Sequence, residues 1–176
     1  MPAWKRGPAA DASEDRLGIK WVVGFPPNVG RGLPAITATT IISDATTGLP
    51  LGILDAGGIT ALRTAAVSGV AIARWGPADP GPVTIVGAGV QARSHLPIVA
   101  HLLPGVAVTI CDRDPVRAET LAAEIAAGEH GQIGEISVAI DAAEAVENAA
   151  MVLTLVSFGP ERQSIPVDAF REDATV

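Results

Sequence analysis

The chain has 176 residues, of which 48% are hydrophobic, and a formal net charge of −7 at pH 7. This acidic balance argues against nucleic acid or an anionic membrane as the main partner, because both are negatively charged. Gly, Pro, Ser or Thr interrupts the longest uncharged stretches, which leaves no apolar span of about 20 residues to cross a membrane. No signal-peptide pattern follows Lys5 and Arg6, so we expect a globular protein of the cytoplasm.

The first part of the chain is predicted to form a small α+β domain over residues 1–77. After a polar segment, three strands are predicted from alternating or β-branched residues, over 17–25, 35–43 and 49–54. Residues 44–48 have turn chemistry, which indicates an antiparallel hairpin between the last two strands. A helix is predicted over 57–75 from one apolar stripe at helical spacing, formed by Ile59, Leu62, Ala66, Val70 and Ala73.

The sequence GPADPG at 76–81 is predicted to be a domain linker, and a second domain is predicted over 78–176. Strands and helices alternate after the linker. The predicted strands are 82–86, 106–111, 135–140 and 150–156, and the predicted helices are 89–102, 115–127 and 141–148, with a further strand opening at 174–176. This order is typical of the α/β class and favours a Rossmann-type, doubly wound parallel sheet with right-handed crossovers.

The turn after the first of these parallel strands carries the pattern G-x-G-x-x-A, formed by Gly87, Ala88, Gly89, Val90, Gln91 and Ala92. The first glycine permits the tight turn, the second lets the backbone approach a pyrophosphate, and the alanine keeps the next helix close to the sheet. The start of that helix offers N–H groups and a partial positive charge to phosphates. The pattern therefore predicts dinucleotide binding, against the alternative of a glycine turn in some other α/β protein.

An acidic residue, Asp112, ends the second parallel strand, 20 residues after Ala92. A carboxylate at that distance accepts hydrogen bonds from an adenosine ribose, which favours NAD as the cofactor. Arg113 offers the alternative of holding a 2′-phosphate, so NADP remains open. The single cysteine, Cys111, lies inside the apolar strand and is interpreted as a core residue rather than a nucleophile. His95 and His101 are six residues apart, so they suggest no metal pair.

Two isolated cations stand in apolar surroundings. Arg63 is the only charged residue between Asp55 and Arg74, and it suits either a structural ion pair with an acid such as Asp55 or a substrate carboxylate. Lys20 lies alone in an apolar strand, where an exposed edge lysine is the ordinary interpretation. The glycines on its face, Gly18 and Gly24, modestly favour a pocket.

Several of these stretches together resemble the ornithine cyclodeaminase/μ-crystallin family. The resemblance rests above all on T-A-L-R-T-A-A at 60–66 and G-A-G-V-Q-A-R at 87–93, and also on G-I-K-W-V at 18–22, R-G-L-P at 31–34 and D-R-D-P at 112–115. It covers nearly the whole chain. It implies a homodimeric enzyme that uses NAD(P) to react at the α-carbon of a small amino or imino acid, as in ornithine cyclodeamination, alanine dehydrogenation or ketimine reduction. A μ-crystallin-like protein that binds NAD(P)H and a carboxylate ligand without turnover is the alternative.

The resemblance also implies roles for individual residues. Lys20 and Arg63 match the substrate-carboxylate residues, and Lys20 is the candidate catalytic residue within the chain. Thr64 and the turn from Gly87 to Gln91 match the pyrophosphate contacts, and Asp112 matches the ribose acid, with Arg113 beside it. The dimer contact is implied to run through the sheet of residues 17–54.

The chain departs from the family pattern in three ways. A segment with another carboxylate-binding arginine, expected before the strand of Lys20, and the family's catalytic aspartate, expected beyond residue 176, are absent from the sequence. We therefore expect a fragment of a longer enzyme, inactive alone. Ala35 stands where ornithine-specific members are expected to carry threonine, which weakens ornithine as the substrate.

Overall fold

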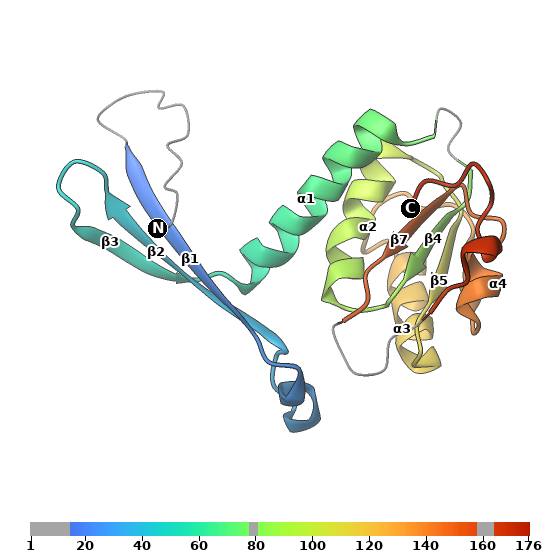
Figure 1. Ribbon diagram of the computed structural model, residues 1–176, viewed down its shortest axis with the longest axis horizontal. Helices are drawn as coiled ribbons and strands as arrows, with labels where there is room; N and C mark the ends of the chain where they lie inside the picture. Colours follow the sequence, from blue (N-terminus) through green and yellow to red (C-terminus); the bar gives the residue numbers. More distant parts are fainter. Residues whose placement is uncertain (1–14, 78–80, 158–163) are drawn as a thin grey trace. The chain divides into compact units, whose positions relative to one another are not determined.

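A computed structural model describes residues 15–77, 81–157 and 164–176 (Figure 1). The chain divides into two compact units between Thr60 and Ala61. That division lies inside a helix, well before the predicted linker at 76–81, of which residues 78–80 lie outside the described part. The assignment of substrate and cofactor roles to domains 1–77 and 78–176 stays a prediction.

The N-terminal unit contains a three-stranded antiparallel sheet in the order β1-β2-β3, with strands Arg16–Gly24, Ile36–Asp44 and Pro50–Asp55. A short 3-10 helix, η2 (Pro26–Arg31), lies in the predicted loop. The Asp44 Oδ1 atom accepts hydrogen bonds from the backbone N–H groups of Thr46 and Thr47, at 2.9 and 2.8 Å. Gly48 closes this turn with a φ of +74°, and the predicted hairpin is confirmed.

The apolar face of β1 is exposed. Trp21 is 73% exposed, and the neighbouring positions on that face are also solvent-accessible: Ile19, Val23 and Phe25. The alternation predicted from the sequence is therefore present, but the heavy apolar side is not covered within the described part of the chain.

Helix α1 (Gly57–Trp75) has the predicted bounds, but the apolar stripe from which it was predicted is not the face that it buries. The buried face of α1 lies beside the stripe and consists mostly of residues with small side chains. Its buried residues are Thr60, Ala61, Ala65, Gly69 and Ile72. The five stripe positions, from Ile59 to Ala73, are exposed. The reason is close packing, since a Cβ on Gly69 would lie 2.7 Å from the Ile98 Cγ2 atom of the following helix. A large side chain on this face would hold the two helices apart.

The C-terminal unit contains a parallel sheet in the order β6-β5-β4-β7, which confirms the Rossmann-type fold (Figure 1). Its strands are β4 (Val83–Val86), β5 (Val108–Cys111), β6 (Ile136–Ala139) and β7 (Met151–Thr154). The connecting helices are α2 (Val90–Leu102), α3 (Pro115–Ala126) and α4 (Ala142–Val146), and a short η3 (Val167–Ala169) follows. Thr175 makes an isolated parallel bridge to Met151, at the position where the sequence predicts that a further strand begins.

Alternation along the central strands assigns each face of this sheet to different helices. Ile85 and Ile110 face the main core, which also contains Leu96 of α2 and Leu121 of α3. On the other face, Val86 packs with Val146 of α4. The central sheet is thus covered on both sides, as a parallel sheet requires. None of the helices in the described ranges is long and apolar enough to span a bilayer.

Candidate functional site: the glycine turn and its surroundings

The turn between β4 and α2 begins at Gly87, whose backbone has a φ of +107°. Its N–H donates to the Cys111 carbonyl at 2.7 Å, and a Cβ at this position would lie 2.6 Å from the Leu155 carbonyl oxygen. Only glycine fits this conformation and this space. The turn lies where the strand order reverses between β4 and β7, which is the usual ligand crevice of open α/β sheets.

Gly89 is different, because the protein itself does not require a glycine there. Its φ of −93° and ψ of −162° are available to any residue, and it serves as the N-cap of α2 with no side-chain cap. An added Cβ would meet only one side-chain atom, Arg117 Nη2, at 3.4 Å. Open space beside an uncapped helix N-terminus suits a phosphate that approaches the backbone closely. Ala92 is fully buried and holds α2 against the sheet, as predicted.

Asp112 is buried at the end of β5 and is tied to the turn by its carboxylate. Oδ2 accepts the Ala88 N–H at 2.7 Å, and Oδ1 accepts the Asp114 N–H at 3.0 Å. Each carboxylate oxygen keeps a further lone pair for a ribose hydroxyl. Arg113, the next residue, is exposed. The acid and the glycine turn are therefore brought together as the sequence predicted.

The two other positions of the turn differ in exposure. Val90 is 71% exposed. Gln91 is half-buried, and its Oε1 atom is buried without a hydrogen-bond partner among the described residues. An orphaned acceptor of this kind is costly in a folded protein unless something else satisfies it. The open space at Gly89 beside an uncapped helix N-terminus shows that the residues present fit a bound dinucleotide.

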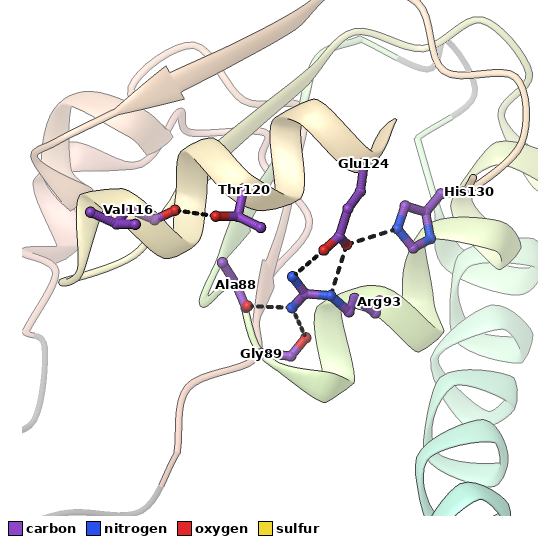
Figure 2. Close-up of polar contacts among 7 residues, drawn as sticks. All are labelled: Ala88, Gly89, Arg93, Val116, Thr120, Glu124 and His130. Carbon is purple, nitrogen blue, oxygen red and sulfur yellow. Dashed lines mark hydrogen bonds and ion pairs between the residues drawn. The ribbon is translucent and has the colours of Figure 1, made fainter. Parts of the chain in front are cut away.

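Arg93 hydrogen-bonds both to the backbone of the turn and to an acid on α3 (Figure 2). Its Nη1 donates to the carbonyls of Ala88 and Gly89 at 2.8 and 3.5 Å, and its Nε and Nη2 form a fork with Glu124 of α3 at 2.8 and 2.7 Å. His130 lies 3.3 Å from the same carboxylate. The hydrogen bond from Arg93 is the main reason that the pKa of Glu124 is lowered.

Sequence reasoning gave Arg93 no role in the site. The available signals were a charged residue directly after the G-x-G-x-x-A pattern and an acid on the following helix.

Cys111 is fully buried, and burial, followed by the charges of Asp141 and Asp112, raises the pKa of its thiol. It is a core residue, as expected.

Lys20 on β1 is half-buried and is not a free edge lysine. Its Nζ donates to Thr60 Oγ1 at 3.0 Å, and the Thr60 hydroxyl donates to the Ala56 carbonyl at 2.8 Å. The ammonium is therefore directed toward the first turn of α1, within the N-terminal unit.

Arg63 and Thr64 belong to the C-terminal unit. Arg63 is exposed and forms no ion pair in the described part of the chain, so the structural ion pair considered from the sequence is not formed. Thr64 is half-buried. Because Lys20 and Arg63 lie in different units, their meeting on one carboxylate stays a prediction.

The parallel sheet, the open glycine turn and the acid at the end of β5 place the C-terminal unit in the Rossmann class of nucleotide-binding folds. A family model matches residues 5–167, and the chain belongs to the ornithine cyclodeaminase/mu-crystallin family.

Known proteins share both the sequence and the fold. The ketimine reductase mu-crystallin of Rattus norvegicus is 32% identical, over 84% of this chain and 45% of its own length. A Thermococcus litoralis Δ(1)-pyrroline-2-carboxylate reductase, solved with NADH and L-proline, is 33% identical with a TM-score of 0.72, over 78% of this chain and 42% of its own. An archaeal alanine dehydrogenase dimer with bound NAD is 26% identical with a TM-score of 0.78, over 90% and 47%. This chain spans about half the length of the curated relatives it matches.

Proposed function

We propose that the whole protein is an NAD-dependent oxidoreductase or deaminating cyclase that acts at the α-carbon of a small amino or imino acid. The observation that carries this proposal is the space at Gly89, which no backbone strain or protein packing explains. Relatives with the same fold hold NADH or NAD, which supports the same cofactor here.

The turn would hold the cofactor through its backbone and through Asp112. The uncapped first turn of α2 would bind the diphosphate, and the Asp112 carboxylate would accept the ribose hydroxyls. Thr64 is proposed as a further diphosphate contact and Arg113 as a residue at the adenosine end. When bound, NAD supplies the acceptor, or NADH the donor, of a hydride at the substrate's α-carbon.

We propose that Lys20 and Arg63 bind the substrate carboxylate and that Lys20 acts beside the reacting atoms. The Thr60 hydroxyl holds the Lys20 ammonium at 3.0 Å, which limits its freedom before substrate arrives. Arg63 has an exposed guanidinium whose planar fork matches a carboxylate. The relative solved with L-proline supports a carboxylate ligand.

The proposal extends to assembly and location. The exposed apolar side chains of β1, with Trp21 at 73%, would pack against a second copy through the sheet of residues 17–54. A relative that is a dimer supports this arrangement. The acidic net charge and the buried single cysteine suit the cytoplasm.

Titration with NADH tests the cofactor proposal, with Gly89→Ala as the decisive variant. The added methyl has room in the protein, so the variant is expected to keep the unfolding midpoint of the unsubstituted chain and to lose NADH affinity at least about tenfold. Gly30→Ala is the matched control, since a Cβ there meets nothing within 4 Å and the position has no positive φ. Unchanged NADH affinity in Gly89→Ala would contradict binding at this turn.

Hydride transfer tests the catalytic proposal. The whole protein should change the NADH absorbance when given a small amino acid with NAD, or a cyclic imine with NADH. Cofactor binding without turnover across such a panel would instead favour a mu-crystallin-like binding role.

A further inference from the structure

We propose that Arg117 is a cofactor-binding residue that contacts the diphosphate of the dinucleotide from helix α3. The inference rests on the proposed binding of a dinucleotide at the glycine turn. It adds a side chain from a different helix to a site that otherwise consists of backbone N–H groups and one acid.

The position of the guanidinium carries the proposal. Arg117 Nη2 lies 3.4 Å from the point where a Cβ on residue 89 would lie, and apart from Gly89 and its chain neighbours no other described atom lies within 4 Å of that point. The space that glycine keeps open is thus bordered by a cation. A phosphate that enters this space meets Arg117 directly.

Among the described residues, no carboxylate pairs with this guanidinium. Arg117 is exposed, and no hydrogen bond or ion pair of its side chain occurs in the described ranges. Two acids that precede Arg117 in the chain are engaged with backbone, and Glu119, which follows it, forms no ion pair in the described ranges. Asp112 accepts N–H groups from Ala88 and Asp114, and Asp114 Oδ1 caps α3 by accepting the Val116 N–H at 3.1 Å. Arg117 is therefore free to pair with an incoming anion.

The geometry favours the diphosphate over a 2′-phosphate. Gly89 marks the closest approach of a pyrophosphate to the backbone, whereas the ribose hydroxyls belong beside the carboxylate at the strand end. Arg117 borders Gly89 and, in the described part of the chain, forms no hydrogen bond or ion pair with the Asp112 carboxylate. An arginine fork also matches phosphate oxygens better than a point charge does.

Affinities of NADH, NADPH, ADP and adenosine for the 176-residue chain test this assignment. In Arg117→Ala, affinity for the three diphosphate-containing ligands should fall about tenfold each, and affinity for adenosine should not change. In Arg117→Lys, the affinities for these three ligands should lie between those of the unsubstituted chain and those of Arg117→Ala. Arg74→Ala removes the same charge from the last turn of α1 and should leave all four affinities unchanged.

Two results would overturn the assignment: unchanged NADH and ADP affinities in Arg117→Ala, or a loss confined to NADPH, which would place the guanidinium at the 2′-phosphate. These results leave the proposed function standing, because the unsubstituted chain still binds NADH. Failure of the unsubstituted chain to bind any dinucleotide would contradict the proposed function and this inference together.

Discussion

The hydroxyl of Ser68 on α1 lies 2.9 Å from Nε2 of His95 on α2, and His95 Nδ1 lies 2.7 Å from the Gln91 carbonyl. A carbonyl only accepts hydrogen bonds, so Nδ1 carries the proton and Nε2 accepts from the serine. His95 is 1% exposed. The pair therefore joins two helices through a neutral, buried imidazole. Because the imidazole is buried, a substrate could not reach the pair as it would reach a catalytic nucleophile and its base.

This arrangement predicts a pH-dependent stability. Burial lowers the pKa of His95, and the hydrogen bond to Gln91 opposes that shift only partly. A pKa that is lower in the folded chain gives stability that is fully present above about pH 6.5 and is lost as pH falls through the folded value. Urea unfolding should therefore show a lower free energy at pH 5 than at pH 7.5.

Substitution of the histidines separates this effect from that of the carboxylates. His95→Gln should reduce the difference between the two pH values, whereas His101→Gln, an exposed position on the same helix, should keep it. An equal loss of stability on acidification in all three proteins would show that His95 does not cause it.

Gly87→Ala is expected to damage the fold itself. The alanine would take a φ near +107° and bring its Cβ to 2.6 Å from the Leu155 carbonyl. Strain of this kind costs about 2 kcal/mol or more, which lowers the melting temperature by roughly 4–8 °C. Thermal unfolding followed by circular dichroism measures the change. A melting temperature equal to that of Gly89→Ala would contradict the distinction between the two glycines.

Glu124→Gln tests whether the ion pair between Arg93 and Glu124 positions the backbone of the glycine turn. Without the carboxylate, Arg93 keeps a weaker hold on the Ala88 and Gly89 carbonyls, so we expect a loss of about 1 kcal/mol in stability. NADH affinity should fall severalfold, because the turn backbone is less well ordered before binding. Glu119→Gln removes the same charge from the same helix and should change neither quantity. Loss of stability with unchanged NADH affinity would leave Glu124 a purely structural role.

We expect the chain to prefer NADH over NADPH, because the carboxylate of Asp112 repels a 2′-phosphate. Asp112→Asn should reduce the ratio of the two affinities, measured by titration with each cofactor. The ratio is the informative quantity, since the change also weakens the bonds to Ala88 and Asp114. Equal or tighter NADPH binding by the unsubstituted chain would transfer the selectivity to Arg113.

Arg63→Ala should weaken a carboxylate substrate in the whole protein by roughly 30-fold or more. Loss of one partner of a charge pair that substrate binding desolvates typically costs about 2–5 kcal/mol, and ~1.4 kcal/mol is a factor of ten. KM for the amino or imino acid is the measurement, and the Kd for NAD should stay nearly constant. Arg74→Ala on the same helix is the charge control. If NAD affinity collapses while KM is unchanged, Arg63 serves the cofactor instead.

The parallel sheet and its cofactor turn could be predicted because their signals are local. Short β-branched runs, a glycine pattern and an acid at the next strand end follow one another within about 30 residues, and the structure places them together. The antiparallel hairpin was equally visible, since Asp44 and Gly48 impose a turn by their own chemistry.

The face of α1 could not be predicted in the same way. Apolar periodicity weighs large side chains, whereas this helix packs through Ala61, Ala65 and Gly69, which carry little hydrophobic signal. The contacts of Arg93 and the position of Arg117 beside Gly89 were also hidden, because they depend on how α2 and α3 approach the turn across distances in sequence of about 30 residues.

The exposure of Trp21 also gives the protein a built-in optical reporter. The chain has three tryptophans and no tyrosine, so its ultraviolet emission comes from indole alone. Trp21 stands on the open face of β1 and Trp75 at the end of α1, each more than 70% exposed. Emission from Trp21 should lie at the long wavelengths of a hydrated indole and shift to the blue when a partner covers the sheet. A variant with Trp4→Phe and Trp75→Phe would therefore report association of the sheet through the wavelength of its emission maximum.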